Sequence, residues 1–147
     1  RSDMDLDPFN FADALLGVLA QRLTRRLCKE CKKMEVLTRE EYEEYASDYG
    51  GIDLLEKMNI MYEEGMQIYK PAGCPKCNNS GLKGRVGIHE LLLGSDDMKA
   101  LIQRKAKVAE LRDQAIKDGM TTLKQDGIIK VFRGLTSLQE VRAVCIK

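Results

Sequence analysis

Cys28-Lys29-Glu30-Cys31 and Cys74-Pro75-Lys76-Cys77 are two C-x-x-C pairs with the same spacing, and residues 32–73 lie between them. In such a turn two thiolates point at one centre, and two turns supply the four soft ligands of a tetrahedral zinc ion. A closed four-cysteine site has no position for water, so the pairs predict a structural metal site rather than a catalytic one. The predicted zinc ligands are Cys28, Cys31, Cys74 and Cys77.

Two disulfides and a thioredoxin-like dithiol are the alternatives to zinc. Paired C-x-x-C turns in an intracellular protein are more often metal or redox sites than structural disulfides, which favours the metal. A zinc ion held by four thiolates carries a formal charge of −2, and cations near the turns reduce its electrostatic cost. These cations are Lys29, Lys32, Lys33 and Lys76.

The composition is that of a globular protein. The chain has 147 residues, 32% of them charged and 44% hydrophobic, with a net charge of +1. This length suits one domain or two small ones, and the balanced charge gives no argument for a nucleic-acid partner. No apolar run is long enough to span a bilayer and no signal-peptide pattern is present, so we expect a cytoplasmic location.

Residues 7–27 predict a helix that runs into the first cysteine pair. Asp7 and Pro8 fit the N-cap and the first helical position. Apolar residues then follow at helical spacing, at Phe9, Ala12, Leu15, Leu16, Leu19, Leu23 and Leu27.

The segment between the cysteine pairs predicts short elements. Thr38 and Glu41 form a capping box, so an acidic helix is expected to begin there and to end before Gly50. Residues 52–59 predict another helical turn or two, with Leu54, Leu55 and Met58 facing inward. Residues 66–69 alternate in polarity and predict a strand.

After the second pair, residues 78–85 predict a loop, residues 86–93 a strand, and the rest a series of four short helices, the first of them capped by Ser95. Gly127 lies inside the third of these helices, which indicates close packing at that point. His89, the single histidine, is interpreted as structural or solvent-facing, and Cys145 as a small buried hydrophobe.

Catalytic motifs are absent from this sequence. There is no G-x-x-x-x-G-K-[ST] phosphate loop, no dinucleotide fingerprint and no nucleophile motif to accompany His89. We therefore predict no catalytic and no cofactor-binding residues beyond the four metal ligands, and no ATP hydrolysis by this stretch alone.

Several motifs together resemble the C-terminal end of the secretion ATPases, which comprise the type II secretion "E" and type IV pilus assembly proteins. The match covers nearly the whole chain, with its motifs in the right order. It consists of residues 16–23, the two cysteine pairs with Gly73, residues 81–92, Asp126-Gly127 and residues 134–141. These motifs do not separate the type II from the type IV pilus branch.

The resemblance implies an α+β chain at the end of a RecA-like ATPase core. Residues 1–27 would be the tail of that core, 28–77 a tetracysteine zinc-binding subdomain, and 78–147 a strand with a helical bundle. The parent would be a homo-hexameric motor that uses ATP and Mg²⁺, with its nucleotide motifs upstream of this stretch. It would act at the cytoplasmic face of the bacterial inner membrane, with peripheral association through a platform protein, assembling pilin or pseudopilin.

A free-standing zinc module that binds nucleic acid or protein is the alternative function. Aromatic residues make up only 5% of the chain and no stacking platform is interleaved with the basic residues, so we expect no nucleic-acid partner. A phosphate-loop motif just upstream in the gene would support the motor, and a nearby start codon the module.

Overall fold

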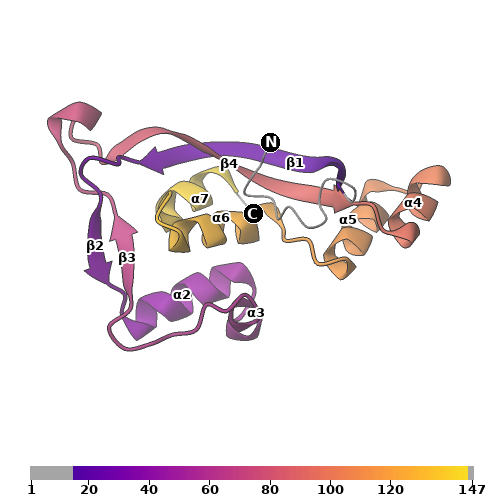
Figure 1. Ribbon diagram of the computed structural model, residues 1–147, viewed down its shortest axis with the longest axis horizontal. Coiled ribbons are helices and arrows are strands. Elements are labelled where there is room, and N and C mark those ends of the chain that lie inside the picture. Colours follow the sequence, from indigo (N-terminus) through magenta and orange to yellow (C-terminus); the bar gives the residue numbers. More distant parts are fainter. Residues whose placement is uncertain (1–14, 146–147) are drawn as a thin grey trace. The chain divides into compact units, whose positions relative to one another are not determined.

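The computed structural model describes residues 15–145 of the chain and has a mixed α+β fold, as predicted. The described part contains six α-helices and two separate two-stranded sheets, one pairing β1 with β4 and the other β2 with β3 (Figure 1). No helix among the described residues is long and apolar enough to cross a membrane. The elements in order are β1 (Leu15–Leu27), β2 (Lys33–Val36), α2 (Arg39–Tyr49), α3 (Ile52–Lys57), β3 (Gln67–Lys70), the 3-10 turn η1 (Pro75–Cys77), β4 (Leu82–Leu93), α4 (Asp96–Gln103), α5 (Val108–Lys117), α6 (Leu123–Phe132) and α7 (Leu138–Val144).

The chain divides into two compact units. Among the described residues, the smaller unit comprises residues 15–21 and His89–Thr122, and the larger unit comprises Arg22–Ile88 and residues 123–145. The smaller unit is built on α4 and α5, which pack around buried Met98, Ala115 and Met120. The hydroxyl of Ser95 accepts the Met98 N–H at 3.0 Å, so Ser95 caps α4 as its sequence predicts.

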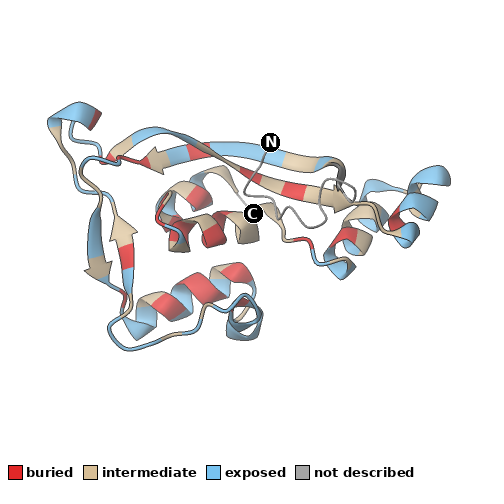
Figure 2. Cartoon of the chain, in the orientation of Figure 1, coloured by how far each residue is buried: buried red, intermediate tan, exposed pale blue. Residues whose placement is uncertain are grey.

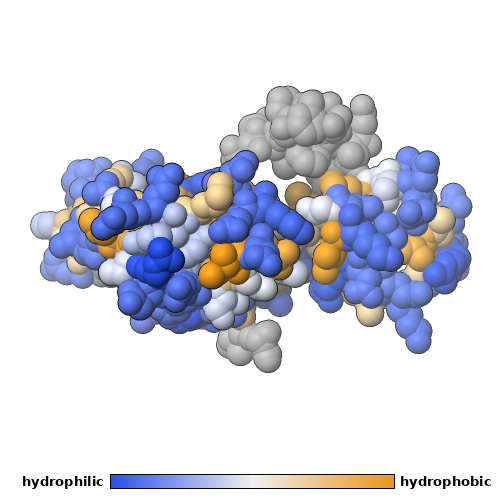
Figure 3. Space-filling model, turned by 90° about the horizontal axis from the view of Figure 1, so that it is seen from below, coloured by the Kyte–Doolittle hydropathy of each residue, from blue (hydrophilic) through white to orange (hydrophobic). Residues whose placement is uncertain are grey.

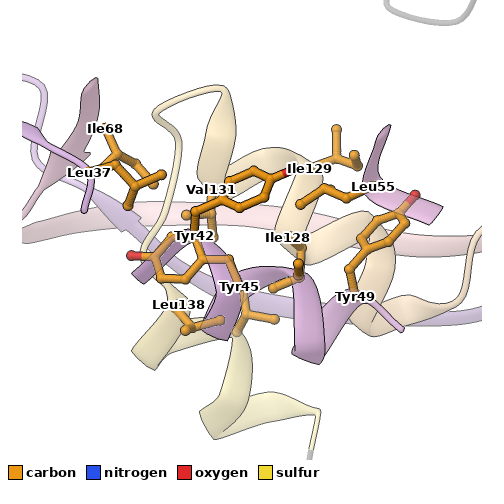
Figure 4. Packing of buried hydrophobic residues seen from close by; sticks show 12 residues of the cluster. Leu37, Tyr42, Tyr45, Tyr49, Leu55, Ile68, Ile128, Ile129, Val131 and Leu138 are labelled. Carbon is orange, nitrogen blue, oxygen red and sulfur yellow. The ribbon is translucent and has the colours of Figure 1, made fainter. Parts of the chain in front are cut away.

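The larger unit has its core between α2 and the last two helices. Helix α2 buries a single face whose side chains recur at intervals of three and four residues, at Tyr42, Tyr45, Ala46 and Tyr49, whereas its other face is exposed (Figure 2). The core joins this face to Ile128, Ile129 and Val131 of α6 and to Leu138 and Val141 of α7 (Figure 4). The segment between the cysteine pairs and the C-terminal helices therefore share one hydrophobic core.

The start of α2 confirms the predicted capping box. The Thr38 hydroxyl accepts the Glu41 N–H at 3.1 Å, and the Glu41 carboxylate accepts the Thr38 N–H at 3.1 Å. Leu37 and Tyr42, on either side of the cap, are both buried in the same core, consistent with the hydrophobic staple that their positions predict. The helix ends at Tyr49, directly before Gly50, as expected.

The predicted helix over residues 7–27 is wrong for residues 15–27, which form strand β1; residues 7–14 lie outside the described part. The leucine spacing fits a helix, but pairing with β4 and three contacts to the C-terminal helices hold this segment extended. Leu27 N–H donates to Leu135 C=O at 2.9 Å, and the Thr24 hydroxyl donates to Glu140 C=O at 2.8 Å. The Thr136 hydroxyl donates to Arg25 C=O at 2.7 Å. Tertiary pairing here overrides helical periodicity, and Gly17 and Thr24 are themselves weak helix formers.

Three further features differ from the sequence prediction: an additional strand, the start of β4 and the burial of residues in and after α3. Strand β2 was not predicted; it pairs antiparallel with β3, with Met34 opposite Tyr69. Strand β4 begins at Leu82 instead of Val86; just before it, Gly81 C=O accepts the Cys28 N–H at 2.9 Å, which ties the start of β4 to the end of β1. In α3 only Leu55 is buried, whereas Leu54 and Met58 are 39% and 43% exposed, since the short helix has one face on the core.

Gly127 is in close contact with α7, as its position inside α6 indicates. A Cβ added at this residue would lie 2.6 Å from Val141 Cγ1 and 3.0 Å from Cγ2. The absence of a side chain thus lets α6 and α7 approach each other.

Candidate metal centre

The four predicted ligands lie on two turns at one end of the larger unit. Cys28 directly follows β1, and Cys31 lies two residues before β2. Cys74 precedes the η1 turn, and Cys77 is its last residue. The first cysteine turn connects β1 to β2, and the second connects β3 to β4. Because β1 pairs with β4 and β2 pairs with β3, the two turns lie next to each other.

The thiols are arranged as a tetrahedral site requires. All four Sγ atoms lie within 4.8 Å of one another. Three pairs, Cys28–Cys74, Cys31–Cys77 and Cys74–Cys77, are each 3.8 Å apart. Four sulfurs at about 2.3 Å from a tetrahedral zinc are about 3.8 Å from one another, so the cluster has the size that zinc needs.

The same distances bear on the alternatives to a metal. A disulfide bond is about 2.05 Å long, whereas these sulfurs are 3.8 Å apart and all five cysteines are free. A two-cysteine redox motif also does not explain why a second pair converges on the first. The four residues are therefore positioned to hold a metal ion.

Backbone N–H groups point at two of the sulfurs. Gly73 N–H donates to Cys31 Sγ at 3.1 Å, and Cys74 and Gly81 N–H donate to Cys77 Sγ at 3.3 and 3.2 Å. Burial opposes ionisation of Cys77, but these two donors and the neighbouring thiols outweigh it and lower its pKa to about 6. The turn thus stabilises a thiolate, which is the form that binds metals.

Cys31 behaves differently. Burial, together with the three neighbouring thiols, raises its pKa to about 11 in spite of the Gly73 N–H. Four thiolates this close repel one another, and a divalent cation supplies the charge that allows all of them to ionise. The electrostatics of the cluster consequently favour a bound cation.

Two glycines are needed where the second turn closes. Gly81 has φ +81°, and a Cβ there would lie 2.6 Å from Pro71 Cβ and 3.1 Å from the Ala72 nitrogen. Gly73 has φ +133° and packs against the Asn79 backbone. Gly73 directly precedes Cys74 and Gly81 follows Cys77 by four residues, and these two glycines are the sequence signal from which the N–H donors could have been predicted.

One lysine links the centre to the C-terminal helices. Lys32 Nζ donates to Gly134 C=O at 2.9 Å and lies 4.3 Å from the centroid of the Tyr69 ring. Lys29 and Lys76 are exposed on the turns themselves. The predicted cationic surroundings of the cysteines are present, but Lys32 also has a structural role that the sequence did not indicate.

The other singled-out residues lie away from this cluster. His89 is half-buried on β4, and the cluster comprises only the four cysteines among the described residues. Cys145 is partly buried and packs against the core of the larger unit, in agreement with its interpretation as a small hydrophobe.

Comparison with known proteins gives consistent matches along the chain. The family model described as "Type II/IV secretion system protein" matches residues 2–143. The type IV pilus assembly ATPase PilB of Thermus thermophilus is 37% identical over 147 residues, which is 99% of this chain and 15% of that protein. The type II secretion system ATPase E of Vibrio cholerae is 39% identical over 142 residues, 97% of this chain and 25% of that protein.

The chain thus spans a quarter or less of the length of these two relatives. Both branches of the family match at similar identity, so the comparison does not separate them. Because the family model covers nearly the whole sequence, the chain belongs to the type II/IV secretion system protein family.

Proposed function

We propose that this chain is the zinc-containing C-terminal part of a hexameric ATPase that drives assembly of pilin or pseudopilin. The observation that carries the proposal is the four-thiol cluster of tetrahedral size in a chain of this family. In this proposal Cys28, Cys31, Cys74 and Cys77 hold one structural Zn²⁺. Residues 1–27 would close a RecA-like core, 28–77 would form the metal subdomain, and 78–147 would form the remaining strand and helices.

ATP and Mg²⁺ would bind in the remainder of the parent protein. The parent would act at the cytoplasmic face of the bacterial inner membrane, associated peripherally through a platform protein. Support for these points comes from the names of the relatives, one a pilus assembly ATPase and the other a secretion ATPase.

The residues of this chain would transmit motion rather than break bonds. Strand β1 leads directly into Cys28, and its end is bonded to the turn between α6 and α7 and to α7 itself through the Leu27, Thr24 and Thr136 hydrogen bonds. Thr24 and Thr136 are 2% and 0% exposed, so these bonds are shielded from competing water. A displacement of β1 would therefore carry the metal turns and the C-terminal helices together.

The metal would tie the first turn to the second. Without it, closing residues 32–73 depends on the β2–β3 pairing and on the packing of α2 against α6. Zinc would supply a cross-link between Cys28–Cys31 and Cys74–Cys77, and metal binding would be coupled to the local folding of both turns.

The test uses the full-length parent with Cys74→Ser and, as a matched control, Cys145→Ser, which changes a cysteine outside the cluster. We expect Cys74→Ser to reduce bound zinc to a trace and to impair filament assembly or secretion, while Cys145→Ser changes neither. Normal assembly with no bound zinc would contradict the structural role of the metal.

A second arm uses the isolated 147-residue chain. It is expected neither to bind ATP tightly nor to hydrolyse it, because no phosphate loop is present in its sequence. Turnover at the rate of the full-length motor, abolished by substitutions within this chain, would overturn the assignment.

A further inference from the structure

Charge is divided between two regions of the larger unit. Residues 22–37 and 67–88 carry ten cations and only two carboxylates, Glu30 and Glu35. They form the end of β1, both cysteine turns, the β2–β3 ribbon and the first part of β4. The cations are Arg22, Arg25, Arg26, Lys29, Lys32, Lys33, Lys70, Lys76, Lys83 and Arg85. We call this region the basic end.

Residues 38–66 have the opposite composition. This stretch, which forms α2, α3 and the segment leading to β3, carries only Arg39 and Lys57 as cations. Its acidic residues are Glu40, Glu41, Glu43, Glu44, Asp48, Asp53, Glu56, Glu63 and Glu64. We call this region the acidic end; it lies at the far end of the β2–β3 ribbon from the η1 turn (Figure 1).

Contacts within the chain account for only part of this charge. On the acidic end, Glu41 pairs with Lys70, and Glu44 and Asp48 pair with Arg142. By contrast Glu63 and Glu64 are exposed and form no ion pair within residues 15–145. On the basic end, Lys83 and Arg85 of β4 are likewise exposed and without a carboxylate partner in the described part of the chain.

The thiolate cluster does not neutralise the basic end. A tetrathiolate zinc centre would contribute a formal charge of −2, which leaves the ten cations and two carboxylates of this region strongly positive. The face shown in Figure 3, seen from below the view of Figure 1, is mostly hydrophilic with separate hydrophobic patches.

We propose that the basic end of one copy of this chain contacts the acidic end of a second copy, with Lys83 and Arg85 facing Glu63 and Glu64. Each copy carries both complementary surfaces. The Glu41–Lys70 ion pair joins the two ends within a copy, whereas the four residues named above are exposed. A contact between two different surfaces is heterologous and closes into a ring or continues into a filament. The inference rests on the proposed function, in which copies form a ring, and it names the surfaces that meet.

The test measures self-association of the 147-residue chain by sedimentation at about 50 mM and about 1 M salt; the Debye length at 1 M is about 3 Å. The variants are Lys83→Glu with Arg85→Glu, and Glu63→Lys with Glu64→Lys. Lys99→Glu with Lys117→Glu, both exposed on the smaller unit, is the matched control. Helical signal and bound zinc are recorded for each variant.

Wild type and control are expected to associate at low salt and to dissociate at high salt. Each reversed variant alone is expected to associate at least about tenfold more weakly, because like charges then face each other. An equimolar mixture of the two reversed variants should associate with each other, because one keeps an intact acidic end and the other an intact basic end.

A wild-type chain that stays monomeric at low salt, reversed variants that associate like wild type, or a mixture that stays dissociated would each overturn the proposal. Binding of the wild-type chain to anionic vesicles without self-association would also overturn it, because the basic end would then bind anionic lipid and not a second copy of the chain. None of these results bears on zinc content or on the ATPase of the parent, so failure here is distinguishable from failure of the proposed function.

Discussion

Gly127→Ala provides a test of the packing between α6 and α7 in which two effects have opposite signs. In an open helix this substitution stabilises the protein by about 1 kcal/mol, because glycine is the poorer helix former. Here the new Cβ would lie 2.6 Å from Val141 Cγ1, and Val141 is fully buried. Overpacking of this kind costs about 1–3 kcal/mol. We therefore expect Gly127→Ala to lower the free energy of unfolding by about 1 kcal/mol.

Chemical denaturation of the zinc-loaded chain measures this change, and a double-mutant cycle identifies its cause. Val141→Ala removes both methyl groups that the new Cβ would meet. In that background Gly127→Ala should become neutral or stabilising, by up to about 1 kcal/mol. A stabilising effect in the wild-type background, or an equal loss in both backgrounds, would show that overpacking against Val141 is not the cause.

Other predictions concern the cap and the ion pairs of α2. Thr38→Ala should lower the free energy of unfolding by about 1 kcal/mol, measured by denaturant unfolding, because it removes the acceptor for the Glu41 N–H. Thr38→Ser keeps a hydroxyl and should retain most of the wild-type stability. Equal losses in the two variants would be inconsistent with a cap. Arg142 binds Asp48 through Nε and Nη2 at 2.7 and 3.0 Å, and this contact lowers the Asp48 pKa. The contribution of the Asp48–Arg142 ion pair to stability is therefore present at neutral pH. It is lost as the pH falls from the ordinary aspartate pKa of about 4 through the lowered pKa of Asp48. Asp48→Asn should flatten the stability–pH curve in that acidic window, and an unchanged slope would count against the pair.

Local signals predicted the elements that depend on short-range contacts. The capping box at Thr38, the stop before Gly50, the Ser95 cap and the Gly127 contact are all present, because each depends on residues a few positions apart or on a single close approach. The four cysteines could also be grouped into one metal site from their spacing alone, since two C-x-x-C turns together supply the four ligands of a tetrahedral ion.

Elements fixed by distant partners were not predictable in this way. Strand β1 carries leucines at helical spacing, yet its hydrogen-bond partners are β4 and residues 135–140, more than fifty positions away. Strand β2 is too short to show a period and is defined only by its pairing with β3. Likewise, the acidic surface of α2 could be recognised, but not that Glu44 and Asp48 face Arg142 of α7.

The shared core also changes what loss of the metal should do. If residues 32–73 were held in place by the metal alone, a Cys74→Ser variant would unfold them separately from the terminal helices. Because Tyr42, Tyr45 and Tyr49 pack on α6 and α7, α2 should stay attached without metal. The greatest loss of hydrogen-exchange protection should instead fall on the two cysteine turns and the adjoining ribbon. Uniform loss across all described helices would contradict this view.

The proposal that four thiolates hold one zinc ion is tested by X-ray absorption at the zinc edge together with elemental analysis of the purified chain. We predict one zinc per chain with four sulfur ligands at about 2.3 Å and no nitrogen or oxygen ligand. Only trace zinc with all four thiols titrating freely, or a first shell containing nitrogen or oxygen, would contradict the claim.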